Sequence, residues 1–256
     1  KPEWARSDGG EAGMHPSNIH DNAYAVGTVD FTGDMPVILG PDGPSLGGFV
    51  CPVTVISADL WKLGQLKAGD KVKFVPVSQD QAVALREALD ESVATLTAAT
   101  AHIKPIKPTT PILDSLSVNE HETGVVYRAA GDNYVLVEYG PMELDIRLRF
   151  RAHALMLWLR DQDHDAILEL TPGIRSLQVH YDSQKLCQRT LLDLLISAEK
   201  ELEKQPEWDV PARIVQLPLS WDDEACQTAI AKYMQSVRKD APWCPSNLEF
   251  IRRING

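Results

Sequence analysis

The sequence predicts an α+β fold in three parts: a partial, barrel-like β unit, a linker helix and a small α+β sandwich. Residues 1–78 are rich in glycine, proline and aspartate and contain short β-type runs, whereas residues 123–256 alternate strand and helix patterns. Between these parts, three prolines in residues 104–111 exclude a helix or a central strand and predict an exposed linker. The expected boundaries are therefore residues 1–78, 79–122 and 123–256.

The first part contains four runs of β-type residues and one short helical pattern. A helix is expected at residues 60–66, ended by Gly69. We expect an antiparallel β unit that is short of strands because its N-terminal portion is missing. The expected strands are residues 26–31, 35–39, 50–56 and 71–77.

The second and third parts show helical spacing alternating with short apolar runs. Apolar residues at positions 83, 85, 89, 93 and 96 predict a helix over residues 79–101. Further helices are expected at residues 142–160, 184–204 and 222–239 and at the end of the chain. Leu144, Ile146, Leu148, Leu155, Leu157 and Leu159 are the expected apolar positions of the first of these. Strands are expected at residues 124–128, 134–139, 167–170, 176–181 and 212–219.

Composition and charge narrow the classes of function. The 256 residues carry a net charge of −11, which argues against nucleic acid and against an anionic membrane surface as partners. No apolar run approaches the length of a membrane span, and no signal peptide is visible. Cys51, Cys187, Cys226 and Cys244 lack paired spacing, so free thiols in a reducing, cytoplasmic compartment are expected, without a zinc site.

A dense polar cluster beside a glycine-rich loop is the strongest candidate site. His15, Asn18, His20, Asp21 and Tyr24 fall within ten positions. The loop at residues 40–48 follows and contains Ser45, Gly47 and Gly48. Polar side chains next to a loop whose backbone tolerates close approach are typical of a site for a small, hydrogen-bonding ligand.

Several long motifs, in order, resemble the carboxyltransferase region of urea carboxylase, called urea amidolyase in fungi. The resemblance extends over nearly the whole chain and is weakest around residues 98–120. The motifs that carry it include His15-Pro-Ser-Asn-Ile-His-Asp21, Asp30-Phe-Thr-Gly-Asp34, Asp42-Gly-Pro-Ser-Leu-Gly-Gly-Phe-Val-Cys51, Val137-Glu-Tyr-Gly-Pro-Met142, Pro172-Gly-Ile-Arg-Ser-Leu177 and Ala241-Pro-Trp-Cys-Pro-Ser-Asn-Leu-Glu-Phe-Ile-Arg-Arg253.

The resemblance implies a fragment of a larger, biotin-dependent enzyme. Residues 1–78 would end a cyclophilin-like carboxyltransferase module, and residues 123–256 would begin a second module whose final barrel is missing. Carboxyl would pass from carboxybiotin, on a carrier domain absent from this chain, to urea to give allophanate, with ATP used by another domain. The expected partners are urea, the biotin carboxyl carrier domain and the remainder of the carboxyltransferase. The isolated fragment is expected to be inactive.

The same resemblance assigns roles to the polar cluster. Asp21 is the expected main urea contact, because a carboxylate accepts from an N–H2 group and orients the nitrogen. Asn18 offers a donor and an acceptor, and His20 and His15 could move a proton or donate to an oxyanion. Ser45, Gly47 and Gly48 could bring backbone N–H groups to a carboxylate.

The same residues could instead have purely structural roles. The His15–Asp21 segment could brace a loop through Asx turns, the glycine loop could be a plain hairpin connection, and Tyr24 fits packing as well as ligand contact. Asp132 is expected to make a turn, and Arg175 and His180 to be exposed. Two rival functions also remain: a 5-oxoprolinase-like, ATP-dependent amidohydrolase component, and a non-enzymatic binding or regulatory module.

Overall fold

The computed structural model describes residues 18–32, 35–44, 46–98, 102–107, 110–118, 123–204 and 210–255. The chain divides into two compact units, and within the described ranges these comprise residues 18–204 and residues 210–255. The first unit mixes helices with sheets, and the described part of the second unit contains two helices. No helix in the described ranges combines the length and apolarity that a bilayer crossing requires.

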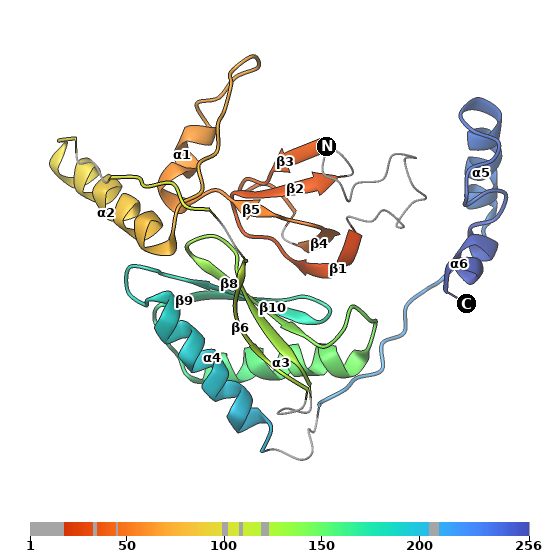
Figure 1. Cartoon of the computed structure of the whole chain (residues 1–256). Helices are drawn as coiled ribbons and strands as arrows, with labels where there is room; N and C mark the ends of the chain where they lie inside the picture. Colours follow the sequence, from red (N-terminus) through yellow and green to blue (C-terminus); the bar gives the residue numbers. More distant parts are fainter. Residues whose placement is uncertain are drawn as a thin grey trace. The chain divides into compact units, whose positions relative to one another are not determined.

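The first part of the first unit contains two small antiparallel sheets (Figure 1). Strand β1 (Asn18–Ala23) pairs with β4 (Leu46–Phe49). Strand β2 (Thr28–Thr32) lies between β3 (Met35–Ile38) and β5 (Val53–Thr54). These strands do not close into a barrel within the described residues, so the barrel-like arrangement expected from the sequence is not confirmed.

The segment after β5 is mostly irregular. A 3-10 turn η1 (Ser57–Asp59) leads into α1 (Leu60–Leu63), which stops at Gly64 and so is shorter than expected. The strand predicted at residues 71–77 is wrong: this stretch is irregular, and Val72, Phe74 and Val75 are exposed. A strand depends on a paired neighbouring strand, and among the described residues this stretch has none; its Pro76 carbonyl accepts from the Ile106 N–H at 3.1 Å, but no strand ladder forms there.

Helix α2 (Gln79–Thr95) confirms the predicted linker helix but ends earlier than residue 101. Its start is fixed by a capping box, in which the Ser78 side chain accepts from the Gln81 backbone N–H and Gln81 accepts from the Ser78 N–H. Strand β6 (Ile112–Leu116) follows, inside the segment interpreted as a linker. The prolines before it obscured its pattern, and its pairing with β7 supplies the missing stabilisation.

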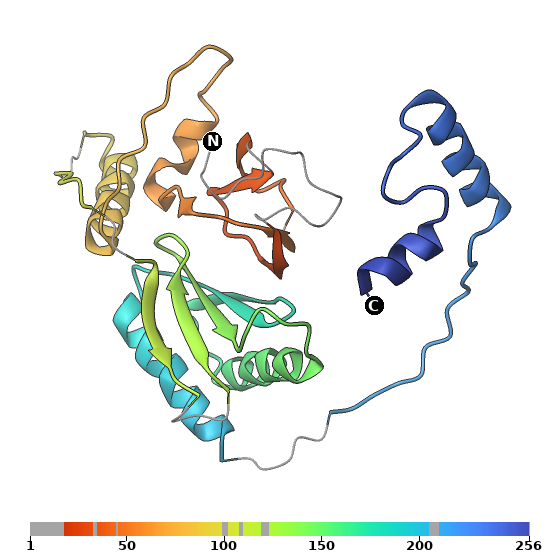
Figure 2. The same cartoon turned by 45° about the vertical axis from the view of Figure 1, so that its right-hand side comes forward.

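A five-stranded antiparallel sheet, in the order β6-β7-β8-β10-β9, forms the rest of the first unit. Its other strands are β7 (Val125–Ala129), β8 (Tyr134–Tyr139), β9 (Ile167–Pro172) and β10 (Ser176–Tyr181), close to the predicted ranges. Helices α3 (Ile146–Asp161) and α4 (Gln188–Leu202) lie on one face of this sheet (Figures 1 and 2). The predicted α+β layer is therefore present.

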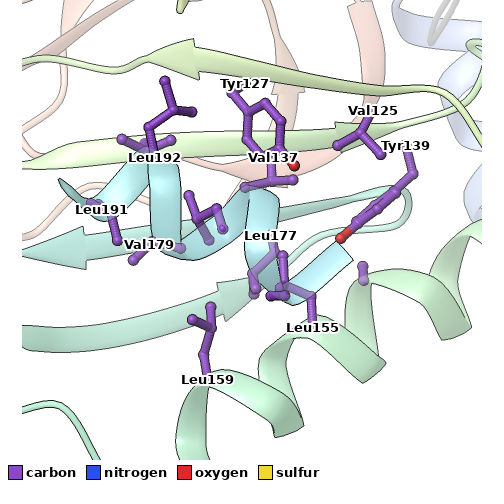
Figure 3. Close-up of a cluster of buried hydrophobic side chains, with 14 of the residues drawn as sticks. Val125, Tyr127, Val137, Tyr139, Leu155, Leu159, Leu177, Val179, Leu191 and Leu192 are labelled. Atoms are coloured by element: carbon purple, nitrogen blue, oxygen red, sulfur yellow. The ribbon is translucent and has the colours of Figure 1, made fainter. Parts of the chain in front are cut away.

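The core lies between this sheet face and the two helices (Figure 3). Burial alternates along β8, where Val135, Val137 and Tyr139 belong to the core. Strand β10 is buried on both faces at residues 176–179, and its Leu177 and Val179 belong to the same core. On α3 the buried apolar positions include Leu148, Leu155 and Leu159. Leu144, Ile146 and Leu157 are exposed instead, because the first lies before the helix and the others lie off its buried stripe.

A buried ion pair crosses this core. The Glu199 carboxylate of α4 is 0% exposed and accepts from Arg151 of α3 and from the Tyr139 hydroxyl of β8. Arg151 Nη2 lies 2.6 Å from Glu199 Oε2. One carboxylate thus links a strand to both helices, with its lone pairs satisfied in a water-poor environment.

The second unit holds α5 (Glu224–Ser236) and α6 (Asn247–Asn255). The Asp223 side chain caps α5 by accepting from the Cys226 N–H at 2.9 Å, so the helix begins two residues later than the predicted start at residue 222. The strand predicted at residues 212–219 is wrong: this stretch is irregular, and Ile214, Leu217 and Leu219 are exposed. It has no paired strand within the described ranges.

Candidate functional site

Strands β1 and β4 bring together the two segments that the sequence singled out. In their register, Asn18 lies opposite Phe49, Asn22 opposite Gly47, and Ala23 opposite Leu46, with an irregularity between Asn18 and Asn22. The polar segment and the glycine-rich segment are therefore neighbouring antiparallel strands. This arrangement is more ordered than a braced loop, and it places Asp21 and Gly47 on a shared ribbon.

Asp21 is exposed, while the residues that follow it are not. Asn22, Ala23, Tyr24 and Ala25 are all buried, so the chain turns inward directly after Asp21. The Asp21 backbone carbonyl accepts from the Ile174 N–H at 2.9 Å. An exposed carboxylate on a strand whose main chain is fixed can accept N–H donors from a ligand without a large loss of conformational freedom.

Tyr24 supports the glycine strand from the buried side. Its hydroxyl accepts from the Phe49 N–H at 2.8 Å, and burial raises its pKa to about 12. A methyl carbon at Gly47 would lie 2.7 Å from the Tyr24 ring. The geometry therefore favours packing for Tyr24, and it explains why position 47 holds no side chain.

A buried carboxyl group, Asp30 of β2, lies near Tyr24. Asp30 is 2% exposed, and its Oδ1 has no hydrogen-bond partner among the described residues. Burial raises the pKa of Asp30, and burial together with the Asp30 charge raises the pKa of the Cys51 thiol to about 12. Tyr24 and Cys51 are therefore neutral at physiological pH and unsuited to act as nucleophiles.

Sequence reasoning did not single out Asp30 as a site residue. A signal was present, because an aspartate in the middle of the β-type run at residues 26–31 is unusual for a half-buried strand. Its burial depends on β3 and β5 flanking β2, which the local pattern does not reveal.

The turn between β9 and β10 meets β1 directly. Besides the Ile174 bond to Asp21, the Gln178 side chain donates to the Ala23 carbonyl at 3.1 Å. Gly173 lies so close that a methyl carbon there would be 2.6 Å from the Asp21 carbonyl oxygen. The candidate site therefore combines segments that are far apart in the sequence: Gln178 and Ala23, for example, are separated by 155 positions.

Arg175 is buried, which corrects the expected exposed position. It is 9% exposed and donates to the Tyr139 carbonyl at 3.1 Å, to the Gly140 carbonyl at 3.2 Å and to Glu138 at 3.0 Å. A guanidinium satisfies three acceptors at once through its planar fork, so burial becomes tolerable. Its role in the described structure is to hold the β9–β10 turn against β8.

Asp132 makes the predicted turn and also links distant segments. It lies in the turn between β7 and β8, and its carboxylate accepts from Ser57 at both the backbone N–H (2.9 Å) and the hydroxyl (2.5 Å). Gln79 donates to the Asp132 carbonyl at 2.8 Å and to the Tyr181 hydroxyl at 3.2 Å. The start of α2 is therefore attached to the sheet at this end.

Several predicted site residues lie outside the described residues. These are His15 and Ser45, together with the side chains of Asn18 and His20, whose backbone belongs to β1. Among the side chains that are described, no group of three histidine, cysteine or acidic residues is placed to hold a metal ion. The four cysteines are free.

Two family models match this chain. Residues 5–76 match the carboxyltransferase domain, subdomain A and B, and residues 125–256 match the carboxyltransferase domain, subdomain C and D. The second match alone spans more than half of the chain.

Similar proteins are all much longer than this chain. Urea amidolyase of Saccharomyces cerevisiae is 42% identical over 262 residues, which is 100% of this chain and 14% of that protein. A putative urea carboxylase of Emericella nidulans is 35% identical over 283 residues, again 100% of this chain and 23% of that protein.

Two solved structures share the fold. The crystal structure of the K. lactis urea amidolyase superposes with a TM-score of 0.82 at 42% identity, covering 100% of this chain and 16% of that chain. The Kluyveromyces lactis urea carboxylase gives a TM-score of 0.80 at 42% identity, covering 98% of this chain and 23% of that chain. This chain therefore spans less than a quarter of each of these proteins.

Proposed function

The chain belongs to the carboxyltransferase domain family and resembles this region of urea carboxylase and urea amidolyase; from this premise we propose that it helps to transfer a carboxyl group from carboxybiotin to urea, giving allophanate. The reaction requires more than this chain. Biotin would arrive on a carrier domain, ATP would be used by another domain, and the remainder of the carboxyltransferase would complete the site. Alone, the chain is expected to be inactive.

The same proposal divides the chain into modules. Residues 1–78 would end the first carboxyltransferase module, and residues 123–256 would begin the second. Residues 79–122 would form the linker between the two modules. The two family matches, to residues 5–76 and 125–256, support this division because each falls within one proposed module.

The exposed carboxylate of Asp21 is the observation that carries the proposal. Urea is neutral and its nitrogens are weak nucleophiles, so a site must hold it by hydrogen bonds and orient one nitrogen toward the carboxyl carbon. Asp21 accepts from a urea N–H2 group in this proposal. Its strand pairs with β4 and its carbonyl is bonded to Ile174, so the carboxylate stands on a constrained backbone.

The other predicted residues complete the donor and acceptor set. Asn18 would donate to the urea carbonyl and accept from its N–H2 group, and His20 would hold or move the proton that the attacking nitrogen loses. His15 and Ser45 would add donors, and the backbone N–H groups of Gly47 and Gly48 would face a carboxylate. Tyr24 acts in support, beneath β4.

The residue types present fit a biotin donor. The ureido ring of biotin is a cyclic urea, so the same hydrogen-bond donors and acceptors that suit urea suit the ring. When bound, carboxybiotin supplies an activated carboxyl group. In the transfer, urea would gain the carboxyl group and lose a proton, the ureido group would lose the carboxyl group and gain a proton, and His20 would hold or move that proton. Asp21 would keep the attacking nitrogen in line.

The test is Asp21→Asn in the intact enzyme that contains this chain. This change keeps the size of the side chain and removes its charge. Allophanate output, measured by mass, should fall by about 100-fold or more, while ATP-dependent carboxylation of biotin stays normal. Asp165→Asn, at a carboxylate that is 91% exposed, is the matched control and should leave both steps unchanged.

Normal allophanate output from Asp21→Asn would remove the assignment of Asp21. If the intact enzyme formed glutamate from 5-oxoproline instead of allophanate from urea, the amidohydrolase alternative would replace this proposal.

A further inference from the structure

The two edges of β1 are held by different parts of the chain. One edge pairs with β4, forming a ribbon of only two strands. Two-stranded ribbons are marginally stable on their own. Additional hydrogen bonds come from the five-stranded sheet, where Ile174 of the β9–β10 turn donates to the Asp21 carbonyl and Gln178 of β10 donates to the Ala23 carbonyl. The backbone on both sides of Asn22 is therefore fixed by residues 174 and 178.

Gly173 allows this contact through its lack of a side chain. A methyl carbon at this position would lie 2.6 Å from the Asp21 carbonyl oxygen and 3.0 Å from the Asn22 Cα. These two neighbours are backbone atoms, which cannot rotate away as a flexible side chain can; the third close atom, Ser176 Oγ at 2.6 Å, belongs to a side chain of the turn itself. A larger residue at position 173 must therefore push β1, and Asp21 with it, away from the turn.

The turn itself is rigid. The Gly173 N–H donates to the Ser176 carbonyl at 2.8 Å, which closes the turn. Arg175 fastens it to the Tyr139 and Gly140 carbonyls. Gln178 is 4% exposed, so its bond to Ala23 is shielded from water. A rigid turn pressed against a marginal ribbon determines where that ribbon lies.

We infer that the turn at residues 173–175 sets the position of Asp21, with Gly173 and Gln178 as positioning residues for carboxyl transfer. The inference rests on the proposed function of Asp21. It means that the second module contributes to the reaction by placing a residue of the first, without Gly173 or Gln178 itself contacting urea.

The first test is Gly173→Ala in the intact enzyme, with Gly64→Ala as the matched control. A methyl carbon at Gly64 meets only the Trp61 carbonyl, at 3.6 Å, and the backbone there is helical. Displacing a catalytic group by about 1 Å can cost about 100-fold in rate. Gly173→Ala should therefore lower kcat/KM for urea by about that factor, with biotin carboxylation unchanged, and Gly64→Ala should change neither.

A double variant separates positioning from general damage. If Gly173 acts through Asp21, adding Gly173→Ala to Asp21→Asn should cause less than a threefold further loss. A further loss as large as that of the single Gly173→Ala variant would overturn the inference. Loss with Asp21→Asn but wild-type activity with Gly173→Ala would overturn this inference alone, whereas wild-type activity with Asp21→Asn would overturn the proposed function.

Gln178→Glu gives a readout that does not depend on folding of a glycine variant. At high pH its carboxylate would face the Ala23 carbonyl and repel it; at low pH the protonated group would donate to that carbonyl. Burial raises the pKa of such a glutamate. Relative to wild type, the activity of the variant should rise several-fold between pH 8 and about pH 6. If the ratio of variant to wild-type activity did not change with pH, the positioning role of Gln178 would be contradicted.

Discussion

The two parts of the first unit differ in how they are stabilised. Residues 112–204 form one continuous sheet under two helices, with a single core that contains side chains fully withdrawn from water. Residues 18–98 form a two-stranded and a three-stranded sheet, and they leave large side chains such as Trp61 and Phe74 exposed. The first part therefore buries little apolar surface by itself.

The difference shows why the candidate site needs both parts. The first part is attached at both ends of the five-stranded sheet: β1 meets the β9–β10 turn, and Ser57 and Gln79 meet the β7–β8 turn at the opposite end. These attachments are hydrogen bonds between segments far apart in the sequence. The core provides the rigid body, and the weaker part carries Asp21.

Among the substitutions proposed here, Glu199→Ala, inside the core, should lower the free energy of unfolding most. The change would remove the buried carboxylate that accepts hydrogen bonds from Arg151 and from the Tyr139 hydroxyl. Breaking a buried ion pair in this way costs about 3–5 kcal/mol of unfolding free energy. Denaturant unfolding of the chain, followed by hydrogen exchange at β8 and α4, would measure the loss. A cost below about 1 kcal/mol would show that the core does not depend on this link.

The same residue gives a pH dependence whose sign follows from its burial. Burial raises the pKa of Glu199 above its ordinary value, so the folded state keeps the proton to a higher pH than the unfolded state. Stability contributed by this group should be complete below about pH 4.3, the usual glutamate value, and should fall as pH rises through the folded pKa. Relative to the Glu199→Gln variant, the wild-type chain should lose unfolding free energy as the pH rises above this value. A gain in unfolding free energy would show that the pKa of Glu199 is shifted in the opposite direction.

Asp132→Ala tests the attachment of the first part and should have an intermediate effect. It removes the two charge-assisted hydrogen bonds that the Asp132 carboxylate accepts from Ser57. Their loss should lower the free energy of unfolding by about 2–3 kcal/mol. The amide of Ser57 should exchange faster while amides of β8 and β10 stay protected. Ser57→Ala, which removes only the hydroxyl bond, should cost about 1 kcal/mol. Equal protection in wild type and Asp132→Ala would show that the attachment depends on other contacts.

Asp59→Ala should have the smallest effect. Its ion pair with Lys62 is exposed on both sides, and exposed pairs contribute about 0–1 kcal/mol. We expect a change in the free energy of unfolding near the lower end of this range, with allophanate formation unaffected. A loss as large as that of Asp132→Ala would show that the surface of the first part contributes more stability than its burial indicates.

The accuracy of the sequence predictions follows the same division. Strands β7 to β10 and helices α3 and α4 were predicted close to their bounds because each has a local pattern that agrees with its environment. The strands expected at residues 71–77 and 212–219 have equally apolar patterns but no paired neighbour in the described ranges. Strand β6 was missed for the opposite reason, because a partner, β7, compensates for a weak pattern.

Local sequence patterns were enough to indicate the mixed fold class and the family resemblance, and they singled out the polar segment and the glycine-rich segment as a candidate site. Contacts between distant segments established that these two segments pair as β1 and β4, that Tyr24 supports β4, that Arg175 and Asp30 are buried, and that Gly173 meets the backbone of Asp21. Periodicity and motifs report on neighbours along the chain. Burial and close backbone approach depend on which distant segments meet, and local patterns do not specify that.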